Sequence, residues 1–161
     1  MKPMFFAAAL AALTAPAFAT SDNASGSPIE FGQPYARSSN PQVGAAFMEL
    51  VNTGDADCTL TEVRADISER VELHTHREDS DGVVRMLPVE EPIIIPAGGS
   101  HWLERGADHV MFIGLHKPLE QGETFMAEFD FGDCGTEPVE LAVDNDFAPE
   151  RAGDAPAHGG H

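Results

Sequence analysis

The chain has 161 residues, and its 27 acidic against 9 basic side chains give a formal net charge of −18 with histidine neutral. A surface this acidic repels nucleic acid and anionic lipid, which excludes both as partners. It suits a cationic cargo or a basic partner, although charge that serves solubility alone is an alternative. After the N-terminal segment, no stretch is apolar and long enough for stable membrane insertion.

Residues 1–19 are typical of a cleaved secretory signal. Lys2 supplies the positive start, Phe5–Leu13 the apolar run and Ala17–Ala19 an A-x-A cleavage signature. A transmembrane anchor is the alternative, but the apolar run is too short for a bilayer core of about 30 Å. We therefore expect cleavage near Ala19 and a mature protein in the periplasm.

The pattern that follows is that of one β domain, expected at 29–145 between a flexible leader at 20–28 and a flexible tail at 146–161. Apolar and polar side chains alternate at 125–131 and 139–143, as in half-buried strands. The stretch 43–51 ends at turn residues, as a strand does. Turn dipeptides recur at Asp81-Gly82, Gly98-Gly99, Arg105-Gly106 and Gln121-Gly122. Short strands joined by such turns favour an antiparallel sandwich or a small barrel.

The two cysteines, Cys58 and Cys134, are expected to form a disulfide, because an exported chain with an even cysteine count usually pairs them. The alternative is a copper thiolate. A blue-copper site needs His and Met a few residues after its Cys, and neither follows Cys134.

Two histidines and two methionines could form a soft-metal site. In a strand, His109 and Met111 would point to the same face, about 6.5 Å apart along the chain. Hairpin-linked segments could bring His74 and Met86 to the same place, since Val71 and Leu73 would take the core face of their strand. Thioethers favour Cu(I) over Zn²⁺, Mg²⁺ or Ca²⁺, which indicates copper.

Each of these residues also has a simpler interpretation. A Met in a strand is often core filler, and a His on a polar face is often only solvated. Met48 and Met126 are expected to be packing residues, and His116 a surface residue.

From about Tyr35 to Val143 the chain resembles the periplasmic copper chaperones of the PCu(A)C family. The matching stretches are 36–37, 44–52, 71–74, 82–89, 95–99, 109–111, 114–115 and 118–122. The family pattern is His, ten residues, Met, twenty-one residues, then His-x-Met. Here each spacer is one residue longer, and we expect the extra residues in loops at Arg77–Asp81 and near Glu90–Pro92.

This resemblance implies a cupredoxin-like antiparallel β-sandwich with Greek-key connections. It also implies Cu(I) binding by His74, Met86, His109 and Met111, and delivery of copper toward cytochrome c oxidase assembly. The expected copper acceptors are Sco-type proteins or an oxidase subunit. Four neutral donors suit a carrier, and we do not expect an enzyme.

The tail suggests a second, weaker Cu(II) site. His158 and His161 could hold Cu(II), which prefers imidazole and oxygen donors, with His76 or His101 as helpers. A solvated tail is the alternative.

Two other functions remain alternatives. A cupin-type metal enzyme would use His74-x-His76 and Pro96–His101, but Ser68 and Arg105 stand where that pattern has Gly and Asn. A binding module that uses no metal is the other.

Overall fold

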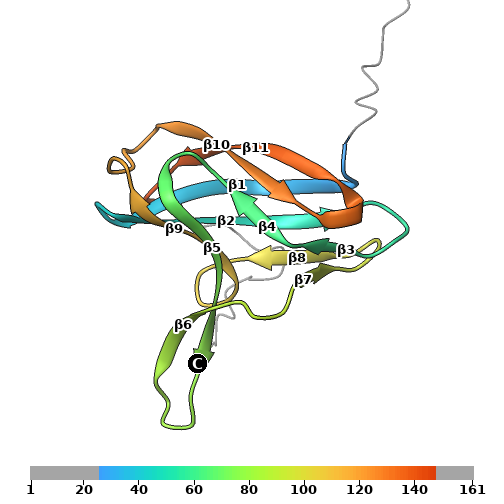
Figure 1. Cartoon of the computed structure of the whole chain (residues 1–161), viewed down its shortest axis with the longest axis horizontal. Coiled ribbons are helices and arrows are strands. Elements are labelled where there is room, and N and C mark those ends of the chain that lie inside the picture. Colours follow the sequence, from blue (N-terminus) through green and yellow to red (C-terminus); the bar gives the residue numbers. More distant parts are fainter. Residues whose placement is uncertain (1–25, 148–161) are drawn as a thin grey trace, which may run out of the picture.

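The computed structural model describes residues 26–147 as an all-β domain (Figure 1). Its elements are β1 (Ile29–Asn40), β2 (Val43–Asn52), β3 (Cys58–Leu60), β4 (Glu62–Arg64), β5 (Ser68–Glu78), β6 (Val84–Pro88), β7 (Ile93–Ile95), β8 (Ser100–Leu103), β9 (His109–Leu115), β10 (Thr124–Asp130), the short 3₁₀ helix η1 (Gly132–Cys134) and β11 (Thr136–Val143). The predicted signal peptide, most of the leader and most of the tail lie outside the described residues. Within residues 26–147, no helix has the length and apolar character to cross a membrane.

The strands form one large sheet and one small one. The large sheet runs in the order β4-β10-β11-β1-β2-β9-β5-β6, with β8 paired to β2, and β3 pairs with β7 in the small sheet. The predicted all-β sandwich is confirmed, and among the described residues its strand pairs are antiparallel with one exception. β1 and β11 run parallel, with Tyr35 opposite Ala142 and Ala36 opposite Val143. β1 therefore lies between two neighbours, pairing antiparallel with β2 and parallel with β11.

One main hydrophobic core fills the interior of the domain. Its largest fully buried side chains are Phe112, Phe129, Phe131, Met48, Leu50, Leu60, Ile95, Leu103 and Leu141. Val71 and Leu73 of β5 pack against this core, as the alternation in their strand predicted. Met48 is only 1% exposed, so its assignment to packing is confirmed. Met126 is 52% exposed, and the same assignment is wrong for it.

A two-stranded arm projects from the large sheet (Figure 1). Up to His74, β5 pairs with β9, whose first residue is His109. Beyond His74, β5 pairs only with β6, and all five residues of β6 are exposed on this sheet edge. We call residues 75–88 the β5–β6 arm.

The loop of this arm lies two residues further along the chain than the sequence suggested. We expected an extra residue in a loop at Arg77–Asp81, but β5 continues through Glu78 and the connection spans residues 79–83. The Asp79 side chain accepts hydrogen bonds from the backbone N–H groups of Asp81 and Val83, at 3.0 and 3.1 Å. Gly82 takes a left-handed φ of 76°, which glycine adopts without steric cost. The turn predicted at Asp81-Gly82 is therefore confirmed.

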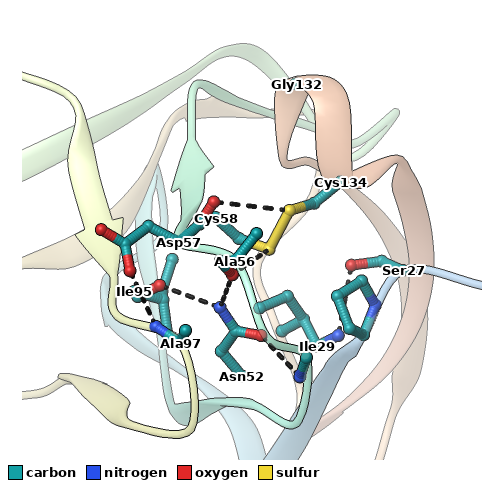
Figure 2. The surroundings of a disulfide bond; sticks show 12 residues. Ser27, Ile29, Asn52, Ala56, Asp57, Cys58, Ile95, Ala97, Gly132 and Cys134 are labelled. Atoms are coloured by element: carbon teal, nitrogen blue, oxygen red, sulfur yellow. Dashed lines mark hydrogen bonds between the residues drawn. A yellow bond between two sulfur atoms is a disulfide. The ribbon is translucent and has the colours of Figure 1, made fainter.

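The predicted disulfide joins Cys58 of β3 to Cys134 of η1, which are 76 positions apart in sequence and have their Cα atoms 5.7 Å apart (Figure 2). Beside it, the buried Asn52 side chain donates hydrogen bonds to the carbonyl oxygens of Ala56 and Ile95, at 2.8 and 3.0 Å. The disulfide thus attaches the β10–β11 connection to the start of β3, next to a loop that the Asn52 hydrogen bonds hold in place. Both sulfur atoms are in the S–S bond, so neither is free to bind a metal ion.

Candidate metal centre

The two histidines closest to the base of the arm lie opposite each other. His74 of β5 and His109 of β9 are register partners, and their ring centroids are 6.2 Å apart. Both are largely buried, with exposed fractions of 9% and 3%. The strand pairing therefore brings together two imidazoles that are 35 positions apart in sequence.

The ring of His109 is oriented by a backbone contact. Its Nδ1 lies 2.9 Å from the carbonyl oxygen of Ala107, and because a carbonyl can only accept, Nδ1 is the donor. In the neutral ring this leaves the lone pair on Nε2. Burial lowers the pKa of His109, and nearby His76 and His74 lower it further, against the opposing Ala107 hydrogen bond. The ring is therefore held in the neutral form that a metal ion requires.

The ring of His74 is oriented by a carboxylate. Its Nε2 donates to Oε2 of Glu72 at 2.8 Å, and Arg70 pairs with the other oxygen of that carboxylate at 3.0 Å. The hydrogen bond from His74, supported by the charge of Arg70, lowers the pKa of Glu72. This carboxylate–histidine pair is the arrangement that commonly orients a metal-binding imidazole.

The other nitrogen of His74 has the properties of a metal ligand. Its Nδ1 is buried and finds no hydrogen-bond partner among the described residues. A buried polar atom without a partner costs about 1–3 kcal/mol. A soft metal ion would satisfy this atom, so the donor chemistry fits the ligand set that the resemblance implies.

The two methionines lie at a surface pocket of about 370 Å³. Met111 on β9 is the register partner of Ala45 and Glu72, and Met86 on β6 is the partner of His76. The pocket is lined by Ala45, Phe47, His76, Met86, Arg105, Gly106, His109 and Met111. Met86 is 54% exposed, so the alternative that it is core filler is wrong.

The structure therefore brings together three of the four expected ligands in one pocket. Met86, His109 and Met111 line it, whereas His74 lies beside His109 but is not a lining residue. His76, expected only as a helper of the tail, does line the pocket. The sequence signal for this was present, because His76 follows His74 by two positions in the same strand.

His101 lies elsewhere. Its Nε2 is 3.0 Å from Oδ2 of Asp108, and both residues line a separate groove of about 620 Å³ along with Thr75 and Leu87. Since Thr75 alternates with His76 along β5, this groove lies on the opposite face of the arm. The cupin-type centre, which needs His101 beside the histidines of β5, is therefore not assembled.

The remaining histidines do not join the pocket within the described residues. His116 is exposed, as expected. His158 and His161 lie outside the residues that the structure describes. Between residues 26 and 147, no group of three or more His, Cys, Asp or Glu side chains is placed to hold a metal ion.

The chain is similar to a known protein family and to solved structures. The family model LpqE-like, described as "Putative lipoprotein LpqE-like", matches residues 29–143. A relative from Leifsonia xyli, "Putative lipoprotein Lxx21020", is 27% identical over 120 residues, which are 74% of this chain and 71% of that protein.

Three similar solved structures, from two proteins, carry further information. The apo PCuAC domain from PmoF1 is 18% identical and superposes with a TM-score of 0.61, over 73% of this chain and 93% of that one. DR1885 from Deinococcus radiodurans, in its apo form, is 30% identical with a TM-score of 0.55, over 91% of this chain and 97% of that one. The same protein, solved with Cu(I), is 28% identical with a TM-score of 0.56, over 80% of this chain and 86% of that one. The chain belongs to the LpqE-like family, and its fold is the cupredoxin-like β-sandwich of a PCuAC domain.

Proposed function

We propose that this protein is a periplasmic copper chaperone that binds one Cu(I) through His74, Met86, His109 and Met111. The observation that carries the proposal is the pairing of two oriented imidazoles beside two thioethers. His109 leaves Nε2 free in the neutral ring, and His74 leaves a buried Nδ1 without a partner. Met86 and Met111 line the pocket that His109 also lines.

The chemistry of these donors favours Cu(I) as the cargo. Two imidazoles and two thioethers are neutral, and thioether sulfur is a good ligand for Cu(I) and a poor one for hard divalent ions. Thioethers also form no disulfides, so such a site persists in an oxidising compartment. The structure of DR1885 with Cu(I) supports copper as the metal.

The position of the pocket suits a carrier rather than an enzyme. Met86 stands on the exposed edge strand of the arm, so a partner protein could replace this ligand before the buried imidazoles are disturbed. We propose that the acceptor is a protein of cytochrome c oxidase assembly, such as a Sco-type protein or an oxidase subunit.

Export through residues 1–19 with cleavage near Ala19 is part of the proposal. We do not expect lipid attachment in this chain. Its two cysteines are both in the disulfide, so neither thiol is free for lipid attachment.

We also propose that the tail contributes a second, weaker Cu(II) site through His158 and His161. Phe147, the last described residue, packs on Tyr35 with ring centroids 4.7 Å apart, in a cluster that Met111 also joins. The tail therefore begins beside the pocket, and at about 3.4 Å per extended residue it is long enough for His158 to reach His76.

An anaerobic titration tests the primary proposal. The mature protein is titrated with Cu(I) in competition with a chelator of known affinity, and one equivalent is expected to bind. The test variant is the His109→Ala, Met111→Leu double substitution, which should retain the fold and lose that binding. Equal binding by the double variant and the parent would contradict the proposal.

A further inference from the structure

His76 lies closer to the pocket than the sequence alone suggested. It is the register partner of Met86 across the arm and lines the pocket together with Met86, His109 and Met111. Its ring centroid is 5.3 Å from that of His109, whereas the ring of His74 is 6.2 Å away. Three imidazoles therefore gather at the base of the arm, with His109 near both of the others.

The two β5 histidines occupy different environments. His74 is buried and its ring is held by Glu72. His76 is two positions further along the same face of the strand, on the arm, where β9 no longer covers β5. Consequently His74 approaches His109 from inside the domain, and His76 approaches it from the side of the open pocket.

We propose that His76 is an alternative ligand for the same copper ion and exchanges with His74. This inference rests on the proposed function. Met86, His109 and Met111 are common to both states. In the inner state the fourth ligand is His74, and in the outer state it is His76. Both states contain two imidazoles and two thioethers. No change of charge or oxidation state accompanies the exchange, because one neutral imidazole replaces another.

The exchange would connect storage of the ion with its transfer. The inner state places copper next to the buried Nδ1 of His74, where a partner protein has little access. The outer state places it between His76 and Met86, the two ligands that stand on the projecting arm. A partner that docks on the arm would then meet the ion in its more accessible state.

Cu(I) affinities of His74→Ala, His76→Ala and the double variant test this exchange, with His101→Ala as the matched control. If either imidazole can complete the site, each single variant should lose up to about tenfold in affinity, and the double variant should lose more than the product of the two single losses. His101→Ala should bind like the parent, because His101 lies in the groove on the other face of the arm.

Two results would overturn the inference. If His76→Ala binds like the parent and the double variant binds like His74→Ala, His76 is not a ligand. If the double variant loses no more than the product of the two single losses, the two histidines do not substitute for each other and do not exchange. Failure of the parent to bind Cu(I) would instead remove the proposed function, and the inference with it.

A measurement on the parent covers the case in which His74→Ala does not fold. The ring nitrogen signals of His76 in ¹⁵N NMR should shift or broaden when Cu(I) is added, while those of His101 should not. Unchanged His76 signals in a protein that has bound Cu(I) would overturn the inference without any variant.

Discussion

His74 and His109 lie directly opposite each other on β5 and β9, at the last position where these two strands pair. Beyond them, β5 no longer pairs with β9 and forms the arm with β6, which carries Met86. The proposed ligands are thus placed at a junction, with the imidazoles on the sheet and one thioether on the exposed arm. This arrangement provides both a stable anchor and an exchangeable ligand.

Replacing Met111 by Leu should leave the fold intact, because the side chains are similar in volume and both are apolar. We expect the Cu(I) affinity to fall by about tenfold or more, since a soft donor is lost. The competition titration measures this, with Met126→Leu as a control at an exposed methionine outside the pocket. If Met111→Leu keeps the affinity of the parent, Met111 serves only in packing.

Glu72→Gln should weaken Cu(I) binding although Glu72 is not a proposed ligand. The amide keeps the shape of the side chain but loses the charge that holds the Nε2–H of His74 at 2.8 Å. Because Glu72 acts only through His74, its loss should cost no more than the loss of His74 itself, up to about tenfold in affinity. Glu62→Gln, an exposed carboxylate paired with Arg64, is the matched control and should have no effect. Equal affinities of the two variants would exclude an orienting role.

Reduction of the Cys58–Cys134 disulfide should destabilise the protein by about 4 kcal/mol in the chain-entropy account of a long closed loop. Chemical denaturation of the oxidised protein and of a Cys58→Ala, Cys134→Ala variant measures the difference. Cu(I) affinity should be unchanged as long as the variant is folded. A thiol titration of the unfolded, unreduced protein should find no free thiol, and two free thiols would disprove the bond.

A chain that ends at Phe147 should lose Cu(II) binding and keep Cu(I) binding. Ending the chain there retains the contact between Phe147 and Tyr35, so the rim of the pocket is not disturbed. Cu(II) titration followed by electron paramagnetic resonance compares this chain with the full one and with a His158→Ala, His161→Ala variant. An unchanged Cu(II) stoichiometry and spectrum would show that the tail histidines are only solvated.

The local pattern was enough to predict β2, β10 and β11, several turns and the face on which His74 lies. Val71 and Leu73 point to the core because side chains alternate along any strand, and this holds without knowledge of the partner strands. Met126 shares a face of its strand with Glu128 and Asp130 in the same alternation, so its exposure followed from the pattern and its assignment to packing went against it.

The pairing of distant strands could not be read from the pattern. The parallel pair of β1 and β11, the early departure of β5 from β9 and the resulting arm all depend on contacts between residues far apart in sequence. For this reason the sequence, which placed His74 and His76 on one face of a strand, did not indicate which of the two lines the pocket.

X-ray absorption of the Cu(I)-loaded full-length protein tests the central claim most directly. Two imidazoles and two thioethers predict a first shell that contains both nitrogen and sulfur scatterers, with imidazole multiple scattering. The sulfur contribution should decrease in Met111→Leu. A first shell of nitrogen and oxygen alone in the parent would contradict the proposed site.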